Sequence, residues 1–365
     1  MNMEIAVLGG GHGCYAAAAE LSEKGNRVRF WRRDKEALGP VIETGSITVK
    51  DYRGERDVSI AYPTTSLEDT VKGAEIIVIP LPATTHETLS NQLAPLLEDG
   101  QVVYLPPGTF GTFLFARALK KTGRRVSVSF AETGTLPYLA RKHGQRKVVI
   151  SGYATRLPTG VFPALDTERT LAILKQIYPV EFCKDALSGA LMNAGPIIHP
   201  PLMVMNAAPL EHFDTWDIHN EGTQPSVRRV TDALDDERIR VREALGYGAP
   251  HFPLKDHYNK EGEGEEWMYG RSAHEKLTDS GDWREDIDLS SHRYIAEDIR
   301  LGLSFIASVG KLTGTPTPIA SGILAIASGF TGRDLYAKGR TLENLGLADM
   351  SLNELQDLLR NGFTQ

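Results

Sequence analysis

Short apolar runs alternate with helix-like segments through the first half of the chain. The first run, Ile5–Leu8, is uninterrupted, and glycines and then an alanine-rich segment follow it. Strands that are buried on both faces of a sheet need such continuous apolar runs. Further runs predict strands at 27–31, 46–49, 58–62, 75–80, 101–105, 126–131 and 147–151. Because strands alternate with helices, we expect one doubly wound, parallel α/β sheet of the Rossmann type.

The pattern changes near residue 186. Beyond it, apolar positions recur at helical spacing at 187–192, 227–245, 294–312 and 319–327, and strand signals almost disappear. We therefore expect an α/β domain of residues 1–186 followed by an all-α domain of residues 187–365. The polar segment from Asp256 to Asp288 contains Trp267, Met268, Tyr269 and Trp283. It is either a partial cover over a site or a mobile loop anchored by its aromatic residues.

Composition narrows the class of protein. The chain has 365 residues, of which 41% are hydrophobic and 24% charged, as in ordinary globular proteins. A net charge of −7 without a basic block argues against nucleic acid as a partner. No apolar stretch has the length of a membrane helix, and the chain opens on a strand, not on a signal peptide. Cys14 and Cys183 provide no disulfide framework. We expect a cytoplasmic enzyme with neither a membrane nor a nucleic-acid partner.

The glycine-rich turn after the first strand has the spacing of a dinucleotide-binding fingerprint. Gly9 permits a tight turn, and Gly11 allows the backbone to approach a pyrophosphate. The helix that follows directs its free N–H groups and the positive end of its dipole toward that phosphate. We assign Gly9, Gly11, His12, Gly13 and Cys14 to a cofactor site in residues 1–186. Cys14 stands where the fingerprint has its last glycine, and an ordinary glycine turn is the alternative.

The residues after the second predicted strand bear on the choice of cofactor. Arg32 and Arg33 directly follow a strand that ends at Trp31. Guanidinium groups bind phosphate through paired hydrogen bonds, which favours the 2′-phosphate of NADP. If the strand extends further, Asp34 would meet the ribose and select NAD instead. We expect NADP, with NAD as the alternative.

The helical half carries two candidate segments for acid–base chemistry. His199 lies between an apolar run and two prolines, and histidine titrates near neutral pH. In the predicted helix at 294–312, Asp298 can orient a histidine, and Arg293 just before it can bind a carboxylate. From these segments alone, a structural histidine and a solvated helix start are the more ordinary interpretations. No metal-ligand spacing and no serine-hydrolase elbow occurs. Other histidines lie in loop-like sequence and are assigned to surface or structural positions: His212, His219, His251 and His257.

Taken together and in order, the segments of the chain resemble the opine dehydrogenase family. That family joins a nucleotide domain to a helical domain related to those of glycerol-3-phosphate and ketopantoate dehydrogenases. The resemblance implies reductive condensation of an amino acid's amine with a 2-oxo acid by NADH or NADPH. The matching segments are 9–19, 80–83 with His86, 107–108, 132–133, 193–200, 206–208, 221–222, 225–227, 293–294, 297–298, 316–318 and 339–347.

The resemblance also implies roles for single residues. The family's catalytic histidine falls on His199, its aspartate on Asp298 and its carboxylate-binding arginine on Arg293. Pro82 and Glu132 lie in matching segments of the nucleotide domain, and we expect them at the cofactor. We also expect the residues that select the amino acid to lie near Asn193, the segment 201–205 and the polar segment 256–288, with Asn193 binding substrate.

We therefore expect the two halves to meet at a crevice where the imidazole, held by Asp298, faces the nicotinamide. The apolar helices of the second half also make a homodimer the expected assembly. Two alternatives remain open. One is a plain 2-oxo or 2-hydroxy acid dehydrogenase, and the other is a non-enzymatic NADP-binding sensor.

Overall fold

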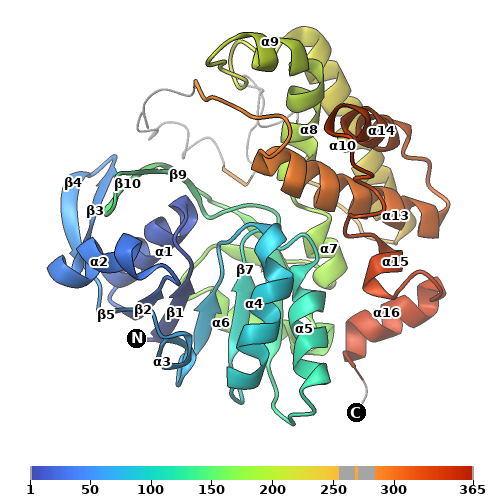
Figure 1. The fold of residues 1–365 in the computed structure, drawn as a ribbon. Coiled ribbons are helices and arrows are strands. Elements are labelled where there is room, and N and C mark those ends of the chain that lie inside the picture. Colours follow the sequence, from blue (N-terminus) through green and yellow to red (C-terminus); the bar gives the residue numbers. More distant parts are fainter. Residues whose placement is uncertain (1, 255–267, 270–283, 364–365) are drawn as a thin grey trace. The chain divides into compact units, whose positions relative to one another are not determined.

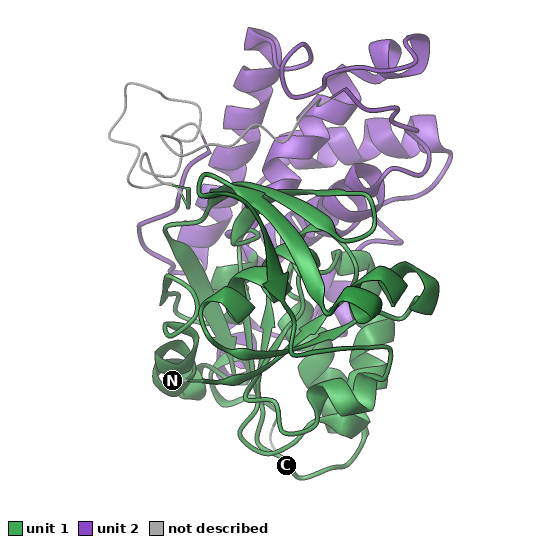
Figure 2. Cartoon of the chain, turned by 90° about the vertical axis from the view of Figure 1, so that its left-hand side faces the viewer, with its two compact units in different colours: residues 1–190, 268–280, 358–365 green, residues 191–267, 281–357 purple. Residues whose placement is uncertain are grey.

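The chain separates into two compact units (Figure 2) in a computed structural model that describes residues 2–254, 268–269 and 284–363. Unit 1 consists of residues 1–190, 268–280 and 358–365, and unit 2 of residues 191–267 and 281–357. The first division, between residues 190 and 191, lies near the expected boundary between 186 and 187. Two later stretches of the chain group with unit 1, which the sequence pattern did not indicate.

Eight strands of the described part of unit 1 form a large sheet in the order β12-β11-β8-β7-β6-β1-β2-β5. Strands β1, β2, β5 and β7 of this sheet are labelled in Figure 1. The pairs from β5 to β8 are parallel, whereas β11 runs antiparallel to β8. From β1 the chain builds outward through β2 and β5, and from β6 it builds the other way through β7 and β8. This reversal confirms the doubly wound fold. The bounds are β1 Glu4–Leu8, β2 Arg27–Trp31, β5 Tyr62–Thr64, β6 Ile76–Val78, β7 Val102–Leu105, β8 Ser129–Thr133, β11 Leu157–Phe162 and β12 Val180–Phe182.

The expectation of a single sheet is wrong. The predicted strands at 46–49 and 147–151 belong to a second, smaller sheet in the order β4-β3-β10-β9. One of its strands, β9, reads YLARKH and is mostly half-buried, so it offers no apolar run by which the sequence could reveal it. The pattern also missed β11 and β12. The bounds in the smaller sheet are β3 Ser46–Asp51, β4 Gly54–Ser59, β9 Tyr138–His143 and β10 Lys147–Tyr153.

Helix α1 (His12–Glu23) lies between the two sheets. It packs on β1 and β2 of the large sheet and on β3, β4, β9 and β10 of the smaller one. All residues from Gly13 to Ala19 are buried, because a helix that is covered on every side must be apolar all round. The small alanines let both sheets approach closely. The other helical segments of unit 1 are α2 Lys35–Thr44, α3 Leu67–Val71, η1 Ala83–Thr85, α4 His86–Leu93, η2 Ala94–Leu96, α5 Gly111–Lys121, η3 Ala164–Asp166, α6 Thr167–Leu174 and α7 Ala186–Ala190.

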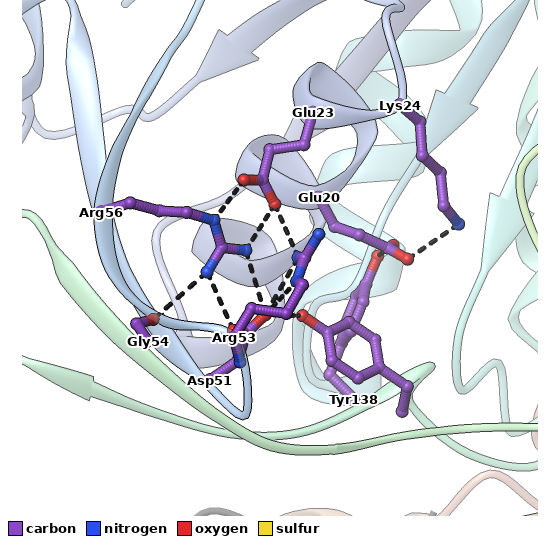
Figure 3. A network of polar contacts seen from close by, with 9 residues as sticks. Glu20, Glu23, Lys24, Asp51, Arg53, Gly54, Arg56 and Tyr138 are labelled. Carbon is purple, nitrogen blue, oxygen red and sulfur yellow. Dashed lines mark hydrogen bonds and ion pairs between the residues drawn. The ribbon is translucent and has the colours of Figure 1, made fainter. Parts of the chain in front are cut away.

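A network of ion pairs fastens α1 to the smaller sheet (Figure 3). Arg56 Nη2 donates to Glu23 Oε2 of α1 at 2.7 Å, and Arg56 Nη1 donates to Asp51 Oδ1 at 2.8 Å. Arg53 also binds both carboxylates. Burial by itself would raise the pKa of Asp51, but hydrogen bonds from the two arginines outweigh burial and hold that pKa well below its ordinary value. The β3–β4 hairpin is therefore fixed on the helix that follows the glycine turn.

Unit 2 is built from helices around a π-helix, η4 (Tyr294–Leu303), which continues directly into α13 (Ser304–Thr313). The predicted helices at 227–245, 294–312 and 319–327 are confirmed, although π geometry in the second of them was not anticipated. Helices α8, α13 and α14 contact η4. A Cβ added to Gly302 of η4 would lie 2.2 Å from Pro196 Cγ of α8, so only glycine permits this approach. The remaining bounds in unit 2 are α8 Gly195–Met205, α9 Ala207–His212, α10 Pro225–Ala244, α14 Pro318–Thr331 and α15 Leu342–Leu345. Helix α16 (Leu352–Asn361) crosses the division, because residues 358–365 group with unit 1.

Candidate active site

The predicted cofactor residues gather at one edge of the large sheet. Parallel strands place their carboxyl ends together, and ligands of such sheets bind where the strand order reverses. Here the reversal lies between β1 and β6. The turn from Gly9 to Cys14 follows β1, and Pro82 follows β6. Arg32 follows β2, and Glu132 is the next-to-last residue of β8.

The glycines of the β1–α1 turn differ in how much space a side chain would find at each position. Gly9 has φ +121°, and a Cβ there would lie 2.4 Å from Leu81 Cδ2, so this glycine is required by the turn itself. A Cβ on Gly13 would lie 2.7 Å from Leu136 Cδ2. Gly11 is different, because it is exposed and a Cβ there would meet nothing within 4 Å. Gly11 occupies the N-cap position of α1 but has no side chain that could accept hydrogen bonds from the helix. The first N–H groups of the helix can therefore bind an anion.

Cys14 serves as a small packing residue. Its Sγ lies 3.5 Å from the carbonyl oxygen of Leu8 and 3.4 Å from that of Pro80, and it donates a weak hydrogen bond to them. Burial raises the pKa of the Cys14 thiol to about 12. The thiol is therefore protonated at neutral pH and chemically inert, and it links β1 to the segment after β6.

Arg32 lies across the glycine turn. Its Nη1 donates to Tyr15 Oη and to the carbonyl oxygen of Ala37, each at 3.2 Å. A Cβ on Gly10 would lie 2.6 Å from Arg32 Nε, so the guanidinium rests against the backbone of the turn. This places a fixed cation beside the N-terminus of α1.

The neighbours of Arg32 have different surroundings. Strand β2 ends at Trp31, and Asp34 Oδ1 accepts a hydrogen bond from the backbone N–H of Ala37 at 3.0 Å as the N-cap of α2. The Asp34 carboxylate is thus engaged in capping. Arg33 is exposed and makes no hydrogen bond or ion pair with any residue that the structure describes.

Pro82 and Glu132 help to shape the loops at this edge. The carbonyl oxygen of Pro82 accepts the backbone N–H of Thr85 at 2.9 Å, which starts η1. Glu132 is completely buried, and its Oε1 accepts a hydrogen bond from Thr112 Oγ1. A Cβ on Gly108 would lie 1.7 Å from Glu132 Oε2. The carboxylate of Glu132 therefore packs directly under the loop between β7 and α5.

In unit 2, the structure brings together His199 of α8 and Asp298 of η4, which are 99 residues apart in the chain. His199 Nδ1 and Asp298 Oδ2 are hydrogen-bonded at 2.8 Å. The side chains are 15% and 6% exposed, so the carboxylate is enclosed and the imidazole is only partly so. Among the described residues, none hydrogen-bonds His199 Nε2. This nitrogen is therefore the atom of the pair that can act on a substrate.

Glycine and asparagine at the start of α8 make room for the pair. A Cβ on Gly195 would lie 2.4 Å from Asp298 Oδ1, so only glycine admits the carboxylate at this place. Asn193, the predicted substrate residue, is buried, and its Oδ1 accepts the backbone N–H of Gly195 at 3.0 Å. Asn193 thus lies beside the pair and organises the first turn of α8.

Two further residues complete the cluster, and sequence reasoning had given neither of them a function. The ring of Tyr294 stacks on the imidazole of His199, with 3.7 Å between ring centroids and 11° between ring planes. Tyr294 Oη is hydrogen-bonded to His219 Nε2 at 3.3 Å. Tyr294 precedes Asp298 by four residues, and this spacing was the available signal. His219 lies in a loop, so its assignment as a surface or structural residue missed its place beside His199.

Burial dominates the electrostatics of the pair. It lowers the pKa of His199 well below its usual value, and the nearby charges of Arg293 and His292 lower it further, while Glu285 acts the other way. Burial raises the pKa of the Asp298 carboxyl to about 7, although Arg293 and His292 partly oppose that shift. The two groups titrate as one unit that gains or loses a proton near neutral pH.

Arg293 has the exposure that a substrate-binding cation needs. Its side chain is 57% exposed. Among the described residues its only ion pair joins Nη1 to Glu297 Oε2 and is long at 3.9 Å, so the guanidinium can still bind a substrate carboxylate. The guanidinium carbon lies 4.8 Å from the centroid of the Tyr294 ring. Arg293 is therefore held next to the residue that stacks on His199.

Only parts of the polar segment 256–288 are described. Met268 and Tyr269 are buried in unit 1, where the carbonyl oxygen of Met268 accepts the backbone N–H of Thr155 at 2.8 Å. In unit 2, Trp216 and Glu285 form an isolated β-bridge. Trp267, Trp283 and His257 lie outside the described residues.

Two general features of the described chain bear on function. Within residues 2–254, 268–269 and 284–363, no helix combines the length and apolar character needed to cross a membrane. Over the same residues, histidine, cysteine and acidic side chains do not form a group of three able to hold a metal ion.

Comparison with known proteins relates both halves of the chain to dehydrogenases. Residues 182–331 match the alpha-helical domain of NAD/NADP octopine/nopaline dehydrogenase, and residues 4–105 match the N-terminus of NAD-dependent glycerol-3-phosphate dehydrogenase. An opine dehydrogenase from Arthrobacter sp. (strain 1C) is 28% identical over 359 residues, covering 95% of this chain and 96% of that protein.

Two solved structures support the fold. Octopine dehydrogenase in complex with NADH and agmatine aligns with a TM-score of 0.71 and 18% identity, covering 100% of this chain and 99% of that one. NADP⁺-bound yersinopine dehydrogenase aligns with a TM-score of 0.63 and 15% identity, covering 98% of each chain. At these identities the likeness establishes a common architecture of a nucleotide domain and a helical domain.

Proposed function

We propose a reaction for this chain on the premise that it belongs to the opine dehydrogenase family. The chain is an NAD(P)-dependent oxidoreductase that acts on CH–NH bonds and joins an amino acid's amine to a 2-oxo acid. The observation that carries the assignment of its catalytic residues is the His199–Asp298 pair. It lies within residues 182–331, the segment that matches the octopine dehydrogenase helical domain.

The reaction requires two chemical steps. The amine attacks the carbonyl carbon of the 2-oxo acid, and loss of water gives an imine. Hydride addition to the imine carbon, with a proton on nitrogen, then gives a secondary amine. A bound nicotinamide supplies that hydride. In total, the amine, the 2-oxo acid, the reduced cofactor and one proton give the secondary amine, water and the oxidised cofactor.

The residues of unit 2 provide acid–base chemistry and orientation. His199 Nε2 donates a proton to the oxygen that leaves as water or to the imine nitrogen, while Nδ1 remains on Asp298. Asp298 fixes the tautomer of the imidazole, and the Tyr294 ring fixes its plane. Arg293 binds a substrate carboxylate, for which its exposed guanidinium is suited. Asn193 contributes to the substrate site from its place beside Gly195.

The residues at the edge of the large sheet fit a dinucleotide. The open space at Gly11 and the uncapped start of α1 suit the pyrophosphate, and Arg32 is placed at the end of β2, where such domains hold the ribose. His12, Gly13, Pro82 and Glu132 complete the proposed cofactor site. In this assignment residues 1–186 bind the dinucleotide and residues 187–365 bind and convert the substrates.

The test is oxidation of NADPH and NADH in the presence of a 2-oxo acid, with and without each of the amino acids. We expect oxidation that depends on the amine, with a secondary amine detected by mass spectrometry. Oxidation that proceeds equally without the amine would instead identify a plain 2-oxo acid dehydrogenase. Tight nucleotide binding without turnover would identify a sensor, and either result would overturn the proposed reaction.

We further propose a cytoplasmic location and a homodimer formed through the helical half. Both cysteines, Cys14 and Cys183, are buried and reduced, which suits a reducing compartment. Light scattering of the purified protein measures its mass directly. A mass near 40.1 kDa would contradict the dimer.

A further inference from the structure

We propose that Lys142, on β9 of the smaller sheet, joins Arg32 in binding the 2′-phosphate of NADP and so sets a preference for NADP over NAD. This inference rests on the proposed function, because it assumes a dinucleotide at the β1–α1 turn. It adds a residue that lies 110 positions after Arg32, in a strand that the apolar pattern did not predict.

Lys142 is held at the N-terminus of α1 because β9 runs along that helix. At one end of the strand, Tyr138 Oη donates to Glu20 Oε2 at 2.6 Å (Figure 3). At the other end, the backbone N–H of Lys142 donates to His12 Nδ1 at 2.8 Å. From residue 20 back to residue 12 a helix rises about 12 Å, and from residue 138 to residue 142 a strand covers about 13 Å. The two lengths match, so both ends of this strand segment are fixed on α1.

The two cations converge on one aromatic ring. Arg32 Nη1 donates to Tyr15 Oη at 3.2 Å, and Lys142 Nζ lies 4.3 Å from the centroid of the same ring. Tyr15 itself packs edge-on against Phe30 of β2, with 5.1 Å between ring centroids. The position of both charges is therefore fixed relative to the end of β2.

Neither cation is neutralised by the part of the chain that the structure describes. Arg32 and Lys142 form no ion pair with a described carboxylate, and Asp34, two residues after Arg32, caps α2. Burial lowers the pKa of Lys142, and the charge of Arg32 lowers it further. Two like charges so close together are unfavourable by themselves, and a doubly charged phosphate ester between them would relieve the repulsion.

The placement favours the 2′-phosphate over the pyrophosphate. In domains of this kind the residue directly after the second strand lies at the ribose, and Arg32 occupies that position. The pyrophosphate has its own site at Gly11 and the first N–H groups of α1. A second cation on the Tyr15 ring that Arg32 also binds is therefore suited to recognise the group that distinguishes NADP from NAD.

The experiment measures dissociation constants by fluorescence titration for NADPH, NADH, adenosine 2′,5′-bisphosphate and adenosine 5′-monophosphate. The last two probes differ only in the 2′-phosphate and need no catalysis. Lys142→Met removes the charge and keeps an apolar chain over the Tyr15 ring. We expect this substitution to weaken NADPH and the bisphosphate about 10- to 100-fold, the usual range for one charged hydrogen bond, and NADH and the monophosphate by less than about twofold. Lys121→Met, at an exposed lysine in the last turn of α5, is the matched control and should change none of the four.

Each other result would overturn the inference. Equal losses of affinity for NADPH and NADH would show that Lys142 binds a part of the dinucleotide that both share. Unchanged affinity for all four probes would show that Lys142 does not contact the nucleotide. Thermal unfolding of the variant shows whether it folds. A wild-type chain that binds NADH as tightly as NADPH also refutes the inference, while amine-dependent turnover would still support the proposed reaction. Conversely, a preference for NADPH that depends on Lys142 can hold even if turnover proves independent of the amine.

Discussion

The β1–α1 turn of unit 1 and the His199–Asp298 pair of unit 2 are built in opposite ways. The turn places its candidate residues within six consecutive positions, and what it offers an anion is mainly backbone N–H groups. The pair joins side chains 99 residues apart, from an α-helix and a π-helix. The first site depends on local conformation, whereas the second exists only if α8 and η4 pack closely. Substitutions in the turn should therefore change mainly nucleotide affinity or stability, whereas substitutions at the pair should change mainly turnover.

The largest effect is expected from His199→Ala. Loss of an acid–base group from its place typically lowers turnover by about 10²- to 10⁴-fold. Nucleotide affinity should stay within about twofold, because the turn that would hold the dinucleotide lies in unit 1 and is unaltered. Steady-state kinetics with saturating substrates and a fluorescence titration with NADPH give the two readouts.

A matched control for this substitution is His212→Ala. His212 is an exposed histidine at the end of α9 in the same unit, and its ring contacts Phe213. It should retain full turnover. If His199→Ala were as active as His212→Ala, the pair would have no part in catalysis.

A smaller but more specific effect is expected from Gly195→Ala. The added Cβ would lie 2.4 Å from Asp298 Oδ1, so the carboxylate must move and the hydrogen bond to His199 must lengthen or break. A displacement of about 1 Å in a catalytic group costs about 100-fold in turnover. The substitution removes neither His199 nor Asp298 and leaves the turn of unit 1 unaltered, so kcat should fall much more than nucleotide affinity.

Gly322→Ala is the control for the effect of alanine in a helix. Gly322 is exposed within α14, and a Cβ there meets nothing within 4 Å. The variant should keep its turnover and gain about 1 kcal/mol in the free energy of unfolding. Equal turnover in the Gly195 and Gly322 variants would show that close packing at Gly195 is not needed for catalysis.

The turn should respond to Gly11→Ala through affinity and not through stability. A methyl group at Gly11 meets no protein atom, but it occupies the space proposed for the pyrophosphate. Overpacking by one methyl costs about 1–3 kcal/mol, so NADPH and NADH should both bind about 10- to 100-fold more weakly. Gly9→Ala should instead lower the free energy of unfolding by about 1–3 kcal/mol, because φ is +121° there. Unchanged affinity of the Gly11→Ala variant would show that the pyrophosphate does not bind at Gly11.

The last effect concerns pH and is the smallest near neutrality. Because the pKa of Asp298 is raised to about 7, the pair holds its extra proton below that pH and loses it above. If His199 donates a proton in the reductive direction, kcat should fall above pH 7 by at most about tenfold per unit, and the oxidative direction should show the reverse trend. Asp298→Asn removes this titration. A wild-type pH profile in that variant would assign the inflection to another group.

Part of the fold was predictable because it depends on residues that are close together in the sequence. Strand β2 was placed at its observed bounds, and the helices at 227–245, 294–312 and 319–327 were recognised from the spacing of apolar residues, whereas α8 and α9 were not. The smaller sheet was not recognised as separate, because strand pairing joins β3 to β10 across about a hundred residues. Strand β9 was missed, since its half-buried and cationic sequence resembles a loop.

The candidate site shows the same division. The segments by themselves made His199 and Asp298 candidates, but only the family resemblance favoured a catalytic role over an ordinary structural position. The stacking of Tyr294 on His199, and the approach of His219, depend on how η4 and the loop after α9 pack on α8. The sequence has no local feature that reports such contacts.

By itself, the sequence determined the glycine turn, the cation that follows β2 and the change from an α/β half to a helical half. These features depend on backbone conformation and on apolar periodicity within a few residues, which are encoded locally. Only the tertiary structure decided that Asp298 meets His199 and that Lys142 lies beside Arg32. Those contacts join distant segments, and their existence depends on which helices and strands can approach closely enough when the core packs.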